Sequence, residues 1–149
     1  MTMGVDKQAP VVAESEIVIA ADPDRVWDVL TDFESWPKWN PAVKSMSIQG
    51  GVEPGTDFNW KAGPGTIKSQ IQQVERPRLI GWTGKTLGIA AVHAYRLEAE
   101  GGQTSVRTEE SYDGFIARVF RVRMQKMLEG SLAAGLQHLK AEAERRSPS

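Results

Sequence analysis

The chain has 149 residues, of which 40% are hydrophobic and 25% charged, and its formal net charge is −1. This length suits one domain with a sizeable core, and the balanced charge gives nucleic-acid binding no electrostatic support. Because the chain contains no cysteine, disulfides, thiolate metal sites and cysteine nucleophiles are excluded.

Targeting and domain signals are few. The first ten residues lack the apolar core of a signal peptide, and no segment approaches the roughly 20 apolar residues of a membrane span. We therefore expect a cytoplasmic protein with no integral membrane association. A single domain is expected over residues 11–146, with flexible tails at residues 1–10 and 147–149.

The chain should open with a strand over residues 11–20, where Glu14 and Glu16 alternate with apolar residues. A helix should then begin near residue 23, because Asp22 is a good N-cap and Pro23 suits the first helical position. The segment Trp36–Pro41 contains two prolines and cannot continue that helix regularly. Two short helices meeting at an aromatic bend are predicted.

Six further segments have β-strand patterning, and glycine- or proline-containing turns separate them. They are Lys44–Gly50, Thr56–Ala62, Thr66–Val74, Leu79–Lys85, Ala90–Glu100 and Thr104–Tyr112. Successive strands joined by short turns predict an antiparallel sheet. From Phe115 to about Arg145 the chain has no proline and its apolar residues recur at helical spacing, which predicts one long amphipathic helix.

The start of that helix carries a basic cluster formed by Arg118, Arg121, Arg123 and Lys126. These residues spread over a wide arc of a helix, which favours an ordinary solvated face. A contact with phosphate or with a membrane is the alternative.

The sequence resembles the polyketide cyclase/dehydrase family of the START-like (SRPBCC) superfamily. The resemblance rests on Ala20–Pro23, Val26-Trp27, Leu30–Asp32 and Trp36–Pro41, and continues through His93-x-Tyr95-x-Leu97-Glu98 and Gly102-x-Thr104-x-Val106. It implies an α+β helix-grip fold: a curved antiparallel seven-stranded sheet wrapped around a long C-terminal helix, with two short helices between strands 1 and 2. Members share an internal cavity but bind or transform different ligands, so the fold alone does not name the function.

The alternation of polar and apolar residues assigns side chains to the concave face of the sheet. We expect its wall to be aromatic and aliphatic with a few polar groups, which suits an apolar ligand with one or two polar handles. The predicted ligand contacts are Phe58, Trp60, Ile67, Ser69, Ile71, Trp82, Tyr95, Thr108 and Tyr112 from the strands, with Phe120 and Met124 from the long helix.

One polar pair stands out on that face. If Gly101-Gly102 forms a two-residue hairpin turn, His93 lies directly opposite Glu110, close enough to share a hydrogen bond. This register also places Arg96 opposite Arg107 on the outer face. A register shifted by two residues would relieve that repulsion and separate His93 from Glu110.

The His93–Glu110 pair could act as an acid–base pair, since the carboxylate raises the imidazole pKa while apolar walls lower it, giving a pKa near neutrality. Tyr95 could then hydrogen-bond a carbonyl oxygen as negative charge develops. The alternative, which we favour, is that the pair only neutralises itself and orients a ligand. No metal and no cofactor is assigned, because His93 and His138 are the only histidines and lie on distant elements.

The predicted function is therefore binding of a small hydrophobic molecule, such as a polyketide, isoprenoid or lipid, in a cavity between the sheet and the C-terminal helix. The first alternative, implied by the resemblance, is a polyketide cyclase/dehydrase, an aromatase/cyclase-like enzyme. The second, also from the resemblance, is an adaptor that acts through its outer surface. A monomer and a homodimer are both compatible with the sequence.

Overall fold

The computed structural model describes residues 5–63 and 65–146. Its strands are β1 (Val11–Ile19), β2 (Ser45–Ile48), β3 (Asp57–Ala62), β4 (Gly65–Glu75), β5 (Leu79–Thr86), β6 (Ile89–Glu100) and β7 (Gln103–Asp113). Its helices are α1 (Pro23–Thr31), the 3-10 helix η1 (Phe33–Ser35), α2 (Trp36–Trp39), α3 (Phe115–Val119) and α4 (Arg121–Arg146). The predicted order of elements is confirmed.

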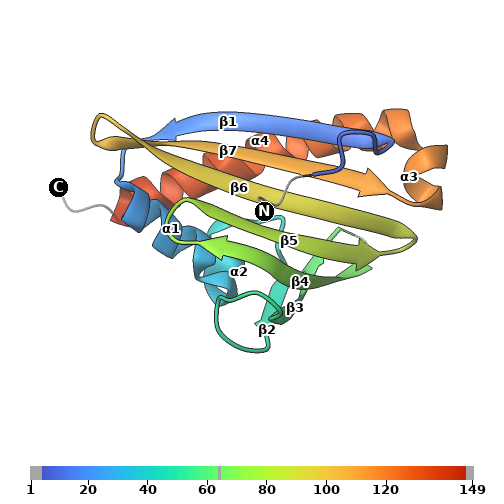
Figure 1. Cartoon of the computed structure of the whole chain (residues 1–149), viewed down its shortest axis with the longest axis horizontal. Coiled ribbons are helices and arrows are strands. Elements are labelled where there is room, and N and C mark those ends of the chain that lie inside the picture. Colours follow the sequence, from blue (N-terminus) through green and yellow to red (C-terminus); the bar gives the residue numbers. More distant parts are fainter. Residues whose placement is uncertain (1–4, 64, 147–149) are drawn as a thin grey trace.

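The strands form one curved antiparallel sheet in the order β1-β7-β6-β5-β4-β3-β2. Helix α4 runs along the concave face and packs chiefly against β1, while α1, η1 and α2 cover the sheet at the C-terminal end of α4 (Figure 1). This is the helix-grip arrangement. It leaves the short helices at one end of the concave face and α3 at the other.

Helix α1 begins where the sequence predicts. The Asp22 side chain accepts a hydrogen bond of 2.8 Å from the backbone N–H of Arg25, and Pro23 occupies the first helical turn. At the other side of the bend, the indole N–H of Trp36 donates to the carbonyl oxygen of Leu30 over 2.9 Å. These bonds fix the short helices as a cap over the sheet.

The main core lies beneath this cap and is aromatic. Phe33 packs against Trp36 and Phe58 with ring centroids 4.7 and 4.9 Å apart, and Trp82 contacts all three rings. A second, smaller cluster joins the start of β1 to the helices through Val11, Ala13, Ala117, Leu128 and Leu132. The concave face is therefore packed most densely at the short-helix end.

The prediction of one uninterrupted helix from Phe115 to Arg145 is wrong at Phe120, whose backbone (φ −109°, ψ 31°) separates α3 from α4. No proline or glycine marks the break. Immediately before α3, Gly114, at φ +107°, turns the chain so closely against the β5–β6 hairpin that a Cβ there would lie 2.3 Å from the carbonyl oxygen of Gly88. Only Ala117 of α3 is buried.

The segment before β1 lies along the outer face of β7. Val5 is buried, the backbone N–H of Asp6 donates to Ser111 Oγ over 3.3 Å, and Lys7 Nζ lies 2.6 Å from Glu109 Oε2. Residues 1–4 and 147–149 of the two predicted tails lie outside the described residues. Flexibility of the tails stays a prediction.

Candidate functional site

The hairpin joining β6 and β7 has the predicted register. Gly101 and Gly102 form its turn with φ of +57° and +85°, Glu100 pairs with Gln103, and His93 lies opposite Glu110. The register shifted by two residues is not adopted.

The repulsion expected on the outer face is offset by acidic neighbours. Arg96 does lie opposite Arg107. However, Arg107 forms an ion pair of 2.6 Å with Glu14 on β1, and Arg96 lies 3.6 Å from Glu109. The two guanidinium groups are thus neutralised from the sides, and the register keeps His93 and Glu110 together.

A hydrogen-bond chain sets the tautomer of His93. Thr108 Oγ1 donates its only proton to the carbonyl oxygen of Ala94 over 3.1 Å, so it can only accept from His93 Nε2, which lies 2.8 Å away. The proton of the neutral imidazole therefore sits on Nε2, and Nδ1 carries a lone pair. Among the described residues Nδ1 has no hydrogen-bond partner within bonding geometry, and Glu110 Oε1 lies 3.4 Å from it.

Burial moves the pKa values of this pair in opposite directions. Desolvation lowers the pKa of His93 to about 3 and raises the pKa of Glu110 to about 8, because each charged form has lost its water. The prediction of a His93 pKa near neutrality is therefore wrong, because desolvation outweighs the effect of the neighbouring carboxyl group. Burial thus favours the uncharged form of both groups, which for Glu110 is the carboxylic acid.

Aromatic rings surround the pair. The His93 ring stacks on Tyr95 at 4.8 Å between centroids and contacts Trp82 at 5.1 Å. The pKa of Tyr95 is raised first by burial and then by the negative charge that Glu110 can carry, and the same two causes raise the pKa of Tyr112. Both phenols remain protonated hydrogen-bond donors at neutral pH.

The predicted ligand contacts fall into three groups. Those buried in the core are Phe58, Ser69, Ile71, Trp82 and Thr108. Those only partly buried are Trp60, Ile67, Tyr95, Tyr112 and Met124. Phe120, at the helix break, is 48% exposed. Trp60 and Tyr95 pack against the aromatic core, whereas Tyr112 and Met124 pack against the smaller cluster near α3.

Two of the predicted contacts satisfy each other. The indole N–H of Trp60 on β3 donates to Ser69 Oγ on β4 over 3.1 Å. The polar atoms of both side chains are therefore engaged within the sheet. Trp60 then offers a ligand mainly its apolar ring.

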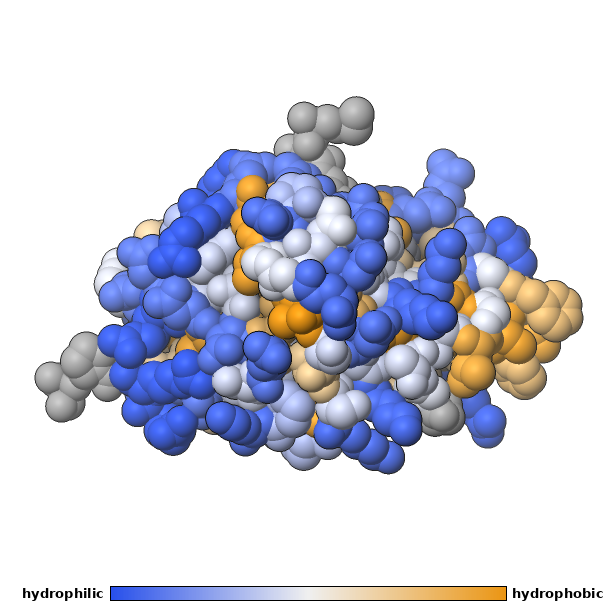
Figure 2. All heavy atoms as spheres, turned by 90° about the horizontal axis from the view of Figure 1, so that it is seen from below, coloured by the Kyte–Doolittle hydropathy of each residue, from blue (hydrophilic) through white to orange (hydrophobic). Residues whose placement is uncertain are grey.

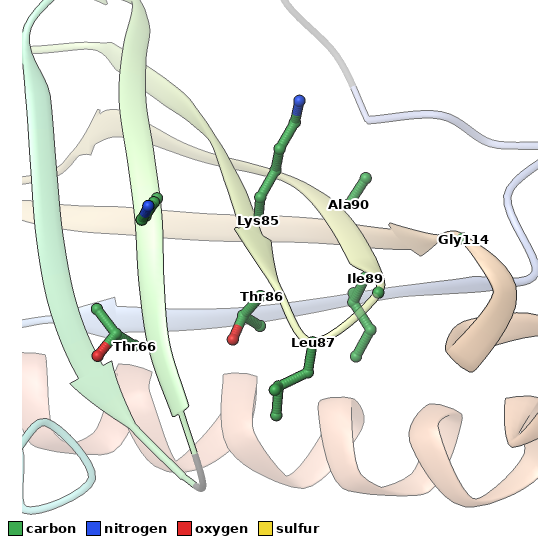
Figure 3. A pocket seen from close by; sticks show the side chains of 9 residues that line it. Thr66, Lys85, Thr86, Leu87, Ile89, Ala90 and Gly114 are labelled. Atoms are coloured by element: carbon green, nitrogen blue, oxygen red, sulfur yellow. The ribbon is translucent and has the colours of Figure 1, made fainter.

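A groove of about 510 Å³ lies at the rim of the sheet beside α3, around the β5–β6 hairpin turn (Figure 3). Its lining residues are Thr66, Lys68, Lys85, Thr86, Leu87, Gly88, Ile89, Ala90 and Gly114. Leu87 and Ile89 point towards α4, whereas Lys85 points away from it. None of these residues was among the predicted contacts. The signal that could have found the groove is Leu87, an apolar residue in a tight hairpin turn.

The groove and the polar pair share one strand. Ile89 and His93 lie on the same face of β6, and four residues of strand separate them by roughly 13 Å. The groove also involves the outer face, because Lys68, Lys85 and Ala90 are neighbours across β4, β5 and β6 on that side. It therefore lies at the rim of the sheet, and Ile89 is its side chain on the face that carries His93.

Residues 10–144 match the family described as polyketide cyclase/dehydrase and lipid transport. The chain belongs to this family. No match is found among curated protein sequences. The family assignment agrees with the helix-grip architecture and with a fold that binds ligands or cyclises polyketides.

Solved structures share the fold at low sequence identity. A hypothetical protein, jhp0584 of Helicobacter pylori, aligns with a TM-score of 0.82 at 16% identity, covering 92% of this chain and 90% of that one. A START superfamily protein from Mycobacterium smegmatis gives 0.80 at 14% identity, with 90% and 97% covered. The Zhui aromatase/cyclase of Streptomyces sp. R1128 gives 0.79 at 17% identity, with 91% and 94% covered. At these identities the likeness shows the fold alone.

Residues 5–63 and 65–146 contain neither a metal-binding cluster nor a membrane-spanning helix. No cluster of three or more histidine and acidic side chains there could hold a metal ion. No helix within the same ranges is long and apolar enough to cross a membrane.

Proposed function

We propose that the concave face binds a small, uncharged and largely hydrophobic molecule of the polyketide, isoprenoid or lipid type, with its polar group at His93 and Glu110. The observation that carries the proposal is the neutral pair itself. An imidazole lone pair and a carboxylic acid proton stand side by side, buried among aromatic rings. Such a pair offers one acceptor and one donor to a ligand without requiring charge on it.

The walls around the pair fit the same ligand class. Tyr95 and Tyr112 are half-buried and keep their protons, so each combines an apolar ring with a hydrogen-bond donor. Towards the open end, Ile67 and Ile89 continue the apolar surface to the groove. A rigid polycyclic or isoprenoid body along this path would place one oxygen near Glu110.

The test uses the fluorescent ketone prodan, which joins an uncharged naphthalene ring to a carbonyl acceptor. We expect saturable binding with a blue shift of the emission. Ile89→Glu, which places a charge in the groove wall, should weaken binding by at least about tenfold, because burying an unpaired carboxylate is costly. Val18→Glu makes the same charge change at an exposed position of β1 and should bind as the parent does. No saturable shift, or equal effects of the two variants, would refute the proposal.

A second candidate is dehydration or cyclisation of a polyketide-like substrate, and the free lone pair on His93 Nδ1 favours it. Nδ1 would take a proton from a carbon beside a carbonyl, and Glu110 would give its proton to the departing hydroxyl, which leaves as water. The proton on Nδ1 then passes to Glu110, 3.4 Å away, and restores both groups. Tyr95 or Tyr112 would donate to the carbonyl oxygen.

The two candidates differ in what a variant loses. For an enzyme, His93→Ala and Glu110→Gln abolish turnover of a β-hydroxyketone, an effect larger than the loss of prodan affinity that follows from removing the polar contact. For a carrier, Trp60→Ala and Ile89→Glu reduce affinity and no turnover is found. If neither pair of variants changes any activity of the protein, the adaptor hypothesis, with a working outer surface, takes their place.

A further inference from the structure

The most unusual surface of the molecule lies where α3 meets α4. Every residue from 118 to 123, Arg-Val-Phe-Arg-Val-Arg, is exposed although the segment is helical on both sides of Phe120. Val122 is 69% exposed, and Phe115, at the start of α3, is 74% exposed. An isolated apolar residue on a surface needs no explanation, but a group of large ones marks an interaction site.

The apolar residues gather at one end of the molecule. In the space-filling view they form the orange group at the right-hand end, beside hydrophilic side chains (Figure 2). We call this group the apolar tip; it consists of Leu87, Phe115, Val119, Phe120 and Val122, each at least 48% exposed. Leu87 also lines the groove, and Gly88 next to it contacts the α3 corner. The tip therefore borders the groove at the rim of the sheet.

Basic residues predominate at the tip. Residues 114–128 contain Arg118, Arg121, Arg123 and Lys126 and no acidic residue, in a chain whose net charge is −1. Arg118 forms an ion pair of 3.2 Å with Asp113, while Lys68 and Lys85 on the neighbouring strands line the groove. The tip thus combines exposed apolar side chains with a positive surround.

We infer that the apolar tip docks on an anionic lipid bilayer. Phe and Val side chains there would enter the boundary between headgroups and acyl chains, and the arginines would contact lipid phosphates, as in interfacial amphipathic helices. An apolar protein partner would not require the surrounding basic residues. A nucleic acid would not require the exposed apolar residues. Docking in this pose turns the groove mouth towards the membrane.

This inference goes beyond the proposed function, since it concerns a surface and not the polar pair. For the basic cluster, it favours a membrane contact over an ordinary solvated face. The tip would bind the bilayer whether or not the concave face holds a ligand. Its test therefore needs no ligand.

The test is sedimentation with vesicles of phosphatidylcholine alone or with 30% phosphatidylglycerol. We expect binding only to the anionic vesicles and a decline as salt rises. Arg121→Gln/Arg123→Gln should reduce the partition coefficient roughly 25-fold, from about fivefold for each basic residue at the surface. Arg76→Gln/Arg78→Gln makes the same charge change at the β4–β5 turn, at the opposite end of the sheet, and should bind as the parent does.

The apolar half of the tip has its own variant. Phe115→Ser/Val122→Ser keeps every charge and should abolish binding even at low salt; both positions are exposed, so the melting temperature should not change. Equal binding to both vesicle types, or parental binding by both tip variants, would overturn the inference. So would a concentration-dependent dimer that forms without vesicles and disappears in Phe115→Ser/Val122→Ser. Prodan titration without vesicles should be unaffected in the arginine variant, which separates this result from a failure of the proposed function.

Discussion

The two ends of the concave face contain the same kinds of side chain but differ in what covers them. At the end covered by η1 and α2, the side chains of Phe33, Phe58 and Trp82 are at most 2% exposed. At the end formed by the β5–β6 hairpin and α3, Leu87 and Phe115 are 62% and 74% exposed. Apolar composition therefore does not separate a core from a binding surface. The short helices close one end, and the break before α4 leaves the other open.

The largest effect is expected at the closed end. Trp82→Ala should reduce the free energy of unfolding by about 3–5 kcal/mol, because Trp82 contacts Phe33, Trp36 and Phe58 and its removal leaves a cavity. Urea denaturation followed by far-UV circular dichroism measures this change. A loss below about 1 kcal/mol would show that the surroundings collapse into the space and that the closed end is not a rigid core.

The neutral pair between the two ends makes stability depend on pH. The raised pKa of Glu110, about 8 against an ordinary 4.5, gives stability that is fully present below pH 4.5 and is lost as pH rises through 8. The lowered pKa of His93, about 3 against 6.5, gives stability that is present above pH 6.5 and is lost as pH falls towards 3. Between pH 4.5 and 6.5 the two slopes cancel.

Of this pair, only Glu110 changes its contribution between pH 6.5 and 8. The free energy of unfolding of the parent protein should therefore fall by up to about 2 kcal/mol over this interval, the effect of releasing one proton. Glu110→Gln should remove that slope, because the amide cannot ionise. Urea midpoints at half-unit steps of pH measure both proteins. A parent slope that persists unchanged in Glu110→Gln would contradict the assignment of the proton to this residue.

A smaller effect is expected where the cover of the closed end begins. Asp22→Ala should reduce the free energy of unfolding by about 1 kcal/mol, because the backbone N–H of Arg25 loses its capping acceptor. Asp22→Asn retains a side-chain oxygen and should cost much less. Thermal unfolding of the two variants in parallel distinguishes loss of the cap from loss of the negative charge.

The smallest effect is expected at the open end. Phe115→Ala should change the free energy of unfolding by no more than about 0.5 kcal/mol, since an exposed ring contributes little to the fold. The same urea assay applies. A cost as large as that of Trp82→Ala would mean that the ring is buried in solution and that the contrast between the two ends does not hold.

Much of the fold was predictable because its signals are local. Asp22-Pro23 specifies a helix start, and Gly101-Gly102 specifies a two-residue turn whose register brings His93 and Glu110 together. The alternation along β6 and β7 then assigns their faces. Each of these conclusions depends on a few adjacent residues and a fixed geometry.

The rest depends on contacts between distant segments. No local pattern marks the helix break at Phe120 or the close approach of Gly114 to the β5–β6 hairpin. The groove beside Leu87 is lined by residues of three strands and by Gly114, so it too depends on how these segments meet. The direction of the His93 pKa could not be settled from sequence either, because it is the balance of burial against a neighbouring carboxylate and only the three-dimensional packing fixes that balance.

The central claim, that the concave face holds an apolar ligand, is tested most directly by the indole N–H signals of the five tryptophans during titration with prodan. Trp60 and Trp82 lie on strands β3 and β5 of the sheet. Trp27 is buried on α1, one of the short helices of the cap. We expect the Trp60 and Trp82 signals to shift saturably with one dissociation constant, whereas the Trp27 signal should not shift. Binding of prodan that leaves Trp60 and Trp82 unmoved would contradict it.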